Sequence, residues 1–176
     1  MRLVQRLTNL TKSSDTGEVV RPPRIAFLGI GNELNGDDAA GVEVVSRLRS
    51  VFITGTNILV LDGGTAPENF TGPMRRFMPQ LVILVDCADM GKEPGSVAWL
   101  EVDELEGFSA STHTLPPTVL AHFLSHEIGC EVGLIGIQPD SLDFGAALSN
   151  PVTEAIDEIV DRIAFIFRLN KVNPLP

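Results

Sequence analysis

Short apolar runs alternate with stretches of helical periodicity through most of this 176-residue chain. The apolar runs are rich in Val, Ile and Leu and are bounded by Gly, Pro or Asp, which is typical of buried strands. The strand-like runs cover residues 24–30, 57–64, 81–88, 96–102 and 131–138, and the helical stretches cover residues 38–49, 116–127 and 151–169. This alternation predicts an α/β fold, a three-layer α/β/α sandwich around a five-stranded and mostly parallel sheet.

Two segments are expected to depart from a regular alternation. The run at 96–102 follows the third strand after a short link that ends in the turn signal Pro94-Gly95. Such a link is too short for a crossover helix, so we expect this strand to be antiparallel. Gly72-Pro73 falls where a helix should connect the second and third strands. Proline costs about 3 kcal/mol in a helix interior, so we expect a broken or shifted helix there.

The chain is expected to divide into an N-terminal extension, residues 1–23, and a single α/β domain, residues 24–176. The extension has leucines at helical spacing, then a polar stretch, and it ends at Pro22-Pro23. It lacks the apolar core of a secretory signal, although its basic, Ser- and Thr-rich composition is compatible with a transit peptide. We expect a flexible or helical segment that frays or docks on a partner.

Composition excludes several classes of function. The net charge is −10 and the pI about 4.6, whereas a nucleic-acid-binding surface needs Lys and Arg to neutralise phosphates. No apolar run reaches the roughly 18 residues of a membrane span. Cys87 and Cys130 could form one disulfide, but two reduced thiols in a cytoplasmic protein are the expected state. We also expect a monomer.

The segment GIGNELNGDDAAG, residues 29–41, begins like a glycine turn for a phosphate. Gly29 and Gly31 match the start of the dinucleotide-binding fingerprint, and Asp62 is placed like its ribose-binding acid. The third glycine is missing, because position 34 is leucine. Asp37 and Asp38 would also repel a pyrophosphate at the start of the helix. A dinucleotide site is therefore disfavoured.

Acidic side chains follow or end three of the predicted strands. Asp38 comes after the first strand, Asp62 ends the second and Asp86 ends the third. In a parallel sheet these positions meet at one edge, where ligands bind. Asp37 could be a helix cap and nothing more. A carboxylate that ends an apolar strand needs a partner or a metal ion.

A metal site of this kind calls for a nitrogen ligand, and the chain has three histidines. His122 and His126 have the i, i+4 spacing of a zinc helix, but position 123 is Phe rather than the required Glu, so we expect both on a helix flank. His113 precedes the helix at 116–127 and could reach the edge that carries Asp38 and Asp86. From the residues alone, a solvated loop histidine stays an alternative.

Six motifs in order, over roughly residues 24–168, resemble those of the hydrogenase maturation endopeptidases, which process the large subunit of nickel–iron hydrogenases. They are GIGNELNGDDAAG, LDGGTAPEN, VDCADMG, PG, STHTLP and GIQPD. The resemblance is greatest to the branch that serves formate-hydrogenlyase-type hydrogenases. It implies removal of a C-terminal extension from the nickel-loaded large-subunit precursor.

The resemblance also implies roles for individual residues. Asp38, Asp86 and His113 match the metal-binding and catalytic set, and the residues expected to support them are Asp37, Asp62, Gly31 and Asn32. The implied metal is nickel held by the substrate, with zinc or another divalent ion possible at the same site. Two carboxylates and an imidazole suit such ions and leave positions open for water or substrate.

Two other functions stay open at this point. One is a non-hydrolytic metal- or nucleotide-binding α/β module, which loss of a ligand residue would have indicated. The other is a metal-independent peptidase that uses a carboxylate pair. Cys87 adjoins Asp86, but at the end of a buried strand it is expected to be an inert thiol rather than a nucleophile.

Overall fold

The computed structural model describes residues 5, 7, 23–52, 57–104 and 116–169. Within these residues five strands form one sheet in the order β2-β1-β3-β5-β4. The strands are β1 (Ile25–Ile30), β2 (Ile58–Gly64), β3 (Leu81–Cys87), β4 (Val97–Glu101) and β5 (Glu131–Ile137). All neighbours pair in parallel except β4, which runs antiparallel to β5. The predicted α/β fold and its one antiparallel strand are confirmed.

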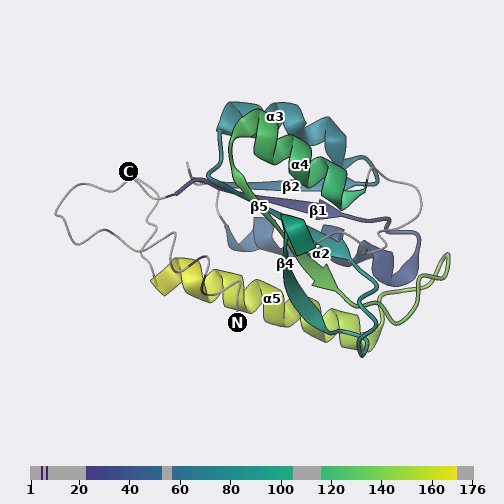
Figure 1. The fold of residues 1–176 in the computed structure, drawn as a ribbon. Helices are drawn as coiled ribbons and strands as arrows, with labels where there is room; N and C mark the ends of the chain where they lie inside the picture. Colours follow the sequence, from purple (N-terminus) through teal and green to yellow (C-terminus); the bar gives the residue numbers. More distant parts are fainter. Residues whose placement is uncertain (1–4, 6, 8–22, 53–56, 105–115, 170–176) are drawn as a thin grey trace.

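Helices cover both faces of this sheet (Figure 1). The α-helices are α2 (Ala40–Val51), α3 (Thr71–Phe77), α4 (Pro117–Ile128) and α5 (Asn150–Leu169), and the 3₁₀ turns are η1 (Gly36–Ala39), η2 (Pro67–Phe70) and η3 (Val102–Glu104). Helices α2 and α5 lie on one face, and α3 and α4 lie on the other. The arrangement is the expected three-layer sandwich.

The two central strands β1 and β3 are buried along their whole length. Alternate side chains enter the two halves of the core: Phe27 and Ile83 pack with α2 and α5, whereas Leu28 and Leu84 pack with α3 and α4. Burial on both faces explains why these strands read as continuous apolar runs rather than as alternating ones.

Leu7 belongs to the segment that the sequence places in the N-terminal extension. Its side chain is fully buried in the core cluster that also contains residues of α2 and α5. This side chain therefore packs against the α/β domain.

The segment around Gly72-Pro73 contains a shifted helix, as expected. A 3₁₀ turn, η2, comes first, and α3 begins at Thr71. Pro73 is then the third residue of α3, inside the first turn, where backbone N–H groups have no partner within the helix. The shift removes the cost of an interior proline.

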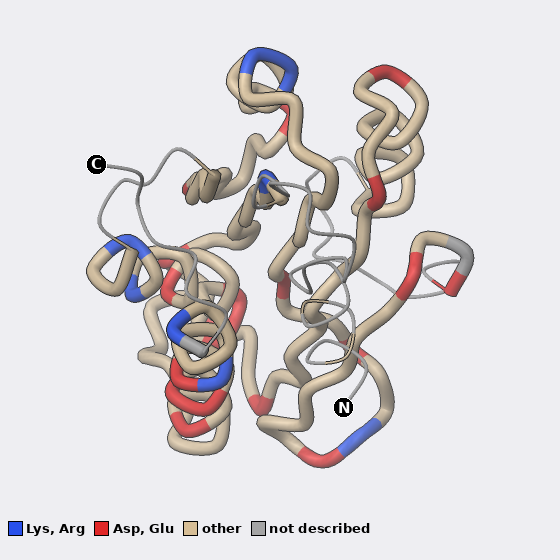
Figure 2. Tube along the Cα trace, turned by 90° about the vertical axis from the view of Figure 1, so that its left-hand side faces the viewer, with Lys and Arg blue, Asp and Glu red and all other residues tan. Residues whose placement is uncertain are grey.

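The surface of the described chain is mainly acidic. Figure 2 shows Asp and Glu on most helices and loops, while Lys and Arg occur in a few places. Among the α-helices α2 to α5, those with basic residues are α2, α3 and α5. None of the described helices is both long and apolar enough to cross a membrane.

Candidate functional site

The sheet has a topological switch point between its neighbouring strands β1 and β3. The chain leaves β1 for β2 on one side, and it leaves β3 for β4, which lies beyond β5, on the other. Crevices that bind ligands form at the carboxyl ends of strands at such points. Asp38 lies in η1, just after β1, and Asp86 is the penultimate residue of β3. The fold therefore places both carboxylates at the switch point.

The glycines of the 29–41 motif allow the start of α2 to lie directly against the strands. A Cβ on Gly41 would lie 2.2 Å from the carbonyl oxygen of Val85, and one on Gly31, which has a φ of 142°, would lie 1.8 Å from that of Asp38. Only glycine fits where two backbones approach this closely. Here the glycine turn brings Asp38 toward β3.

Asp38 and Asp86 are almost completely removed from solvent, with 3% and 1% of their surface exposed. Asp86 Oδ1 accepts a hydrogen bond from the Cys87 N–H at 2.8 Å, and Asp38 Oδ2 accepts one from the Asn32 N–H at 3.1 Å. Asp38 Oδ1 is buried and has no hydrogen-bond partner among the described residues. A buried carboxylate oxygen without a partner is costly, so it indicates a position for a ligand.

Burial and mutual repulsion change how the pair ionises. Burial, and next to it the charge of Asp38, raise the pKa of Asp86 to about 7, while the Cys87 N–H lowers it in part. Burial also raises the pKa of Asp38 above its ordinary value, against the hydrogen bond from Asn32. Two buried carboxylates that disfavour each other's charge are stabilised by a cation. The donor set fits a divalent ion.

The third expected ligand, His113, lies outside the described residues. Among the residues that the structure describes, no group of three or more His, Cys, Asp or Glu side chains could hold a metal ion. Asp38 and Asp86 thus form two parts of a site whose third member stays a prediction.

Asp37, which the sequence suggested as a helix cap, accepts hydrogen bonds from a distant loop instead. Its Oδ2 accepts from the N–H groups of Asp140 (2.8 Å) and Ser141 (3.2 Å), and its Oδ1 accepts from that of Ser149 (2.6 Å). Burial alone would raise the pKa of Asp37, but these three backbone donors hold it below its ordinary value. Asp37 therefore anchors the loop at 138–149 beside the site.

The other supporting residues stabilise the turn at the end of β1. The Gly31 N–H donates to the carbonyl of Gly64 at 3.0 Å, and Asn32 Oδ1 accepts from the Leu34 N–H at 3.0 Å. Asp62 lies at the same sheet edge, next to β1, where its Oδ1 accepts from the Gly64 N–H at 3.1 Å. These contacts order the backbone around Asp38.

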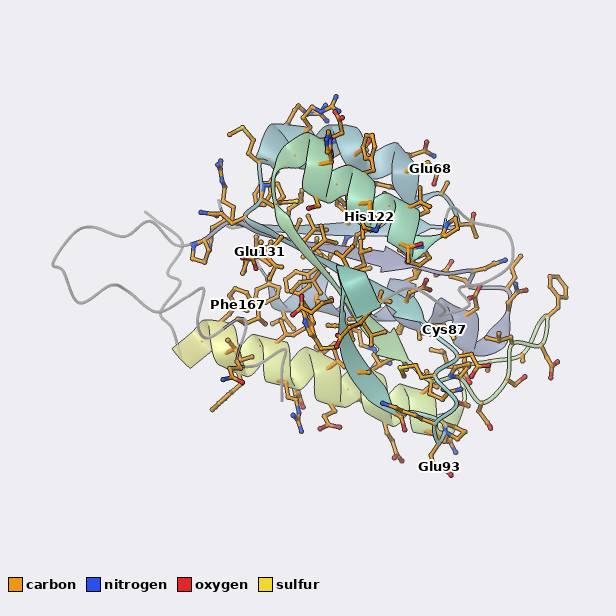
Figure 3. The ribbon with its side chains drawn as sticks, in the orientation of Figure 1. Glu68, Cys87, Glu93, His122, Glu131 and Phe167 are labelled. Carbon is orange, nitrogen blue, oxygen red and sulfur yellow. The ribbon has the colours of Figure 1, made fainter. Side chains whose placement is uncertain are left out.

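His122 and His126 are on the exposed side of α4. Figure 3 shows His122 on this helix, away from Cys87 at the end of β3. His126 Nδ1 lies 3.6 Å from a carboxylate oxygen of its neighbour Glu127, and its side chain is 88% exposed. The expectation that both lie on a helix flank agrees with the structure.

Both cysteines are buried and free rather than joined in a disulfide. Burial, followed by the charges of Asp86 and Asp38, raises the pKa of the Cys87 thiol far above its ordinary value. A thiol of this kind is a poor nucleophile.

Gln138 is a structural residue of this edge to which the sequence assigned no role. Its Oε1 accepts from the N–H groups of Met90 (2.7 Å) and Lys92 (3.2 Å), and its Nε2 donates to Asp89 Oδ1 (3.1 Å). One side chain thereby orders the loop between β3 and β4, which begins after Cys87. The GIQPD motif contains Gln138, so this motif was the sequence signal that could have indicated a role for it.

Comparison with known proteins identifies the family. The hydrogenase maturation protease family matches residues 42–165. A putative hydrogenase maturation protease of Methanocaldococcus jannaschii is 36% identical over 152 residues, which is 77% of this chain and 90% of that protein. The hydrogenase 3 maturation protease of Escherichia coli is 34% identical over 138 residues, 78% of this chain and 86% of that protein.

Solved structures agree with these relatives. The maturation protease HycI of Thermococcus kodakarensis superposes with a TM-score of 0.78 at 32% identity, covering 93% of this chain and 99% of that one. The hydrogenase maturating endopeptidase HybD of E. coli gives a TM-score of 0.69 at 27% identity, covering 83% and 93%. The chain belongs to the hydrogenase maturation protease family.

Proposed function

We propose that this protein removes a C-terminal extension from the large-subunit precursor of a nickel–iron hydrogenase, and that it does so after nickel has been inserted. Family membership makes it a maturation endopeptidase. The observation that carries the finer proposal is the buried pair Asp38 and Asp86 at the switch point, with one carboxylate oxygen left without a partner.

In this proposal Asp38 and Asp86 bind the nickel that the precursor carries, and His113 completes the set. A divalent ion held by these residues would supply Lewis acidity toward the scissile peptide carbonyl and toward water. Zinc or another divalent ion could use the same oxygen and nitrogen donors. We assign the nickel to the substrate rather than to the resting enzyme.

The chain itself prepares the carboxylates for this role. Asn32 and Cys87 fix one oxygen of each carboxylate through backbone N–H groups, so both side chains are oriented before a precursor binds. Because burial and the charge of Asp38 raise the pKa of Asp86 to about 7, this carboxyl group keeps its proton to a higher pH than an exposed aspartate does. That proton must leave when a cation binds, because a metal ligand has to be deprotonated.

We place the protein in the cytoplasm as a monomer. Two free, buried thiols agree with a reducing compartment. The non-hydrolytic module considered from the sequence is disfavoured by the family, whose members are named as proteases.

The test is incubation with a nickel-loaded large-subunit precursor, followed by intact mass measurement of both chains. We expect one cut near the precursor's C-terminus and none in the nickel-free precursor. The Asp86→Asn variant is the matched control, because asparagine keeps the oxygen that accepts the Cys87 N–H. Cleavage of both precursor forms alike would contradict the nickel requirement, and an intact precursor in all samples would contradict the proposed function.

A further inference from the structure

Exposed apolar side chains gather beside the site at the carboxyl edge of the sheet. Phe144 is 80% exposed, Leu34 59% and Leu142 49%. Together with the exposed acids beside them they form what we call the acidic–apolar rim, which consists of Glu33, Leu34, Asp140, Leu142, Asp143 and Phe144. Its two segments are the turn after β1 and the loop at 138–149, which lie at the same end of the sheet (Figure 1).

The two segments of the rim are joined by hydrogen bonds. The Gly145 N–H donates to the carbonyl of Leu34 at 2.7 Å, and the Asp37 N–H donates to that of Ser141 at 3.0 Å. Asp37 also accepts from the backbone N–H groups at 140, 141 and 149. The loop is therefore ordered, and this ordered backbone presents Phe144 to solvent. Exposed apolar residues that are grouped in this way and bordered by polar ones are typical of an interaction site.

The rim also has a uniform sign of charge. Neither residues 29–46 nor residues 129–161 contain a Lys or Arg, although they include Glu33, Asp140 and Asp143. The neighbouring β3–β4 loop contains one basic residue, Lys92. Its backbone N–H donates to Gln138 Oε1. An apolar centre with an acidic border is complementary to an apolar residue flanked by Lys or Arg.

We propose that the acidic–apolar rim is the docking surface for a basic segment of the hydrogenase precursor that carries an exposed apolar residue. This inference rests on the proposed function, because it assigns a recognition role to the border of the same site. Asp37, which anchors the rim, is adjacent in the chain to Asp38. A substrate whose scissile peptide reaches Asp38 and Asp86 therefore has the rim as its neighbouring surface.

The apolar part is tested with Phe144→Ala and the matched control Phe165→Ala. Phe165 is 62% exposed on α5. This helix covers the face of the sheet opposite to α3 and α4. For Phe144→Ala we expect a KM for the nickel-loaded precursor that is roughly 5- to 30-fold higher, as for an interface hot spot, with an unchanged kcat. The control should match the unmodified protein. An unchanged KM for Phe144→Ala, or an equal rise in the control, would overturn the docking surface.

The charged part is tested with the double variant Glu33→Gln and Asp140→Asn. The control removes two charges from α5 with Glu154→Gln and Asp161→Asn, so both proteins have the same net charge. We expect weaker binding, mostly through a lower association rate, and a smaller salt dependence for the rim variant alone. Equal effects in both variants would point to overall charge and would contradict a local docking role.

Measuring binding as well as cleavage separates the two proposals. Titration calorimetry with the nickel-loaded precursor gives the binding constant without any cut, and intact mass gives the cut. If the unmodified protein binds the precursor without cutting it, the proposed function fails, and the affinity of Phe144→Ala still decides the rim. If the unmodified protein cuts the precursor, and Phe144→Ala binds and cuts it equally well, only the proposal that the rim is a docking surface fails. If it neither binds nor cuts, both proposals are wrong.

Discussion

Asp37 accepts a hydrogen bond from the backbone N–H of Ser149 at 2.6 Å, across 112 positions of the chain. This contact joins the turn after β1 to the residue just before α5, while the adjacent Asp38 contributes to the buried carboxylate pair. Two neighbouring aspartates therefore have different roles, one in holding a loop and the other in the candidate metal site.

Asp37→Ala is expected to destabilise the protein by about 2–4 kcal/mol, because three backbone N–H groups lose their acceptor. Asp37→Asn keeps one carbonyl oxygen and should be intermediate. Since the pKa of Asp37 is lowered in the folded state, its contribution is present above the unfolded pKa and is lost as the pH falls through the folded one. Urea unfolding at pH 7 measures the loss, and an unchanged midpoint for the alanine variant would refute the anchoring role.

Asp38→Asn and Asp86→Asn are expected to stabilise the metal-free protein while abolishing nickel-dependent cleavage. Each change removes one charge from a buried pair that repels itself, and it keeps an acceptor for the Asn32 or Cys87 N–H. Thermal unfolding in the presence of a chelator, alongside precursor cleavage, measures both effects. Variants that are less stable and still cut would mean that these carboxylates are purely structural.

The stability gained in Asp86→Asn should depend on pH in a defined direction. Asp86 has a folded pKa of about 7 against an ordinary value of 3.8, so the folded protein binds a proton that the unfolded chain has released. The extra proton on Asp86 stabilises the folded protein. This stabilisation is complete below about pH 4 and is lost as the pH rises to about 7, at up to about 1.4 kcal/mol per pH unit.

Urea unfolding of the chelated proteins at several pH values tests this direction. The difference between Asp86→Asn and the unmodified protein should be small near pH 4 and on the order of 2–4 kcal/mol at pH 8. A gap that is constant or that shrinks with rising pH would show that Asp86 is not a buried acid with a raised pKa.

His113→Ala is expected to abolish cleavage, whereas His122→Ala and His126→Ala should leave it nearly intact. The latter two side chains are exposed on α4, so their loss removes no contact with Asp38 or Asp86. Cleavage of the nickel-loaded precursor, scored by mass, compares the three variants. Equal losses in all three would exclude His113 as the specific ligand.

Gly41→Ala is expected to destabilise the protein by more than about 2 kcal/mol, because the strain of overpacking falls on backbone atoms that cannot move aside. The added Cβ would lie 2.2 Å from the Val85 carbonyl and 2.3 Å from that of Ile30. Gly72→Ala is the matched control, since Gly72 lies in the first turn of α3 with its nearest contact at 3.7 Å. Alanine there should be neutral or slightly stabilising. Thermal unfolding should separate the two variants, and similar midpoints would contradict the close approach of α2 to β3.

The strands show how much of the fold the sequence could predict. Burial on both faces produces a continuous apolar run at 81–85, so β3 was recognisable from composition alone, and the short link through Pro94-Gly95 indicated the antiparallel β4. The shifted start of α3 followed from Pro73, because proline restricts the helix locally. These features depend on residues within one segment, and periodicity and turn chemistry report them directly.

The hydrogen-bond partners of Asp37 and Gln138 could not be predicted from patterns within one segment. Asp37 reads as a cap because an acid at the start of a helix is favoured by the helix dipole, yet its acceptor atoms face a loop more than 100 positions away. Gln138 likewise holds a loop 46–49 positions earlier in the chain. Hydrogen bonds of this range leave no periodic signal.

The sequence by itself determined which segments are strands and helices, which residues carry charge at the strand ends, and, through its ordered motifs, the family. Only the tertiary structure decided that β1 lies beside β3, so that Asp38 and Asp86 meet at the switch point, and that the loop at 138–149 is fastened next to them. The reason is physical. Local burial and turn propensity are properties of a segment, whereas strand order and loop anchoring arise from the packing of segments that are distant in the chain.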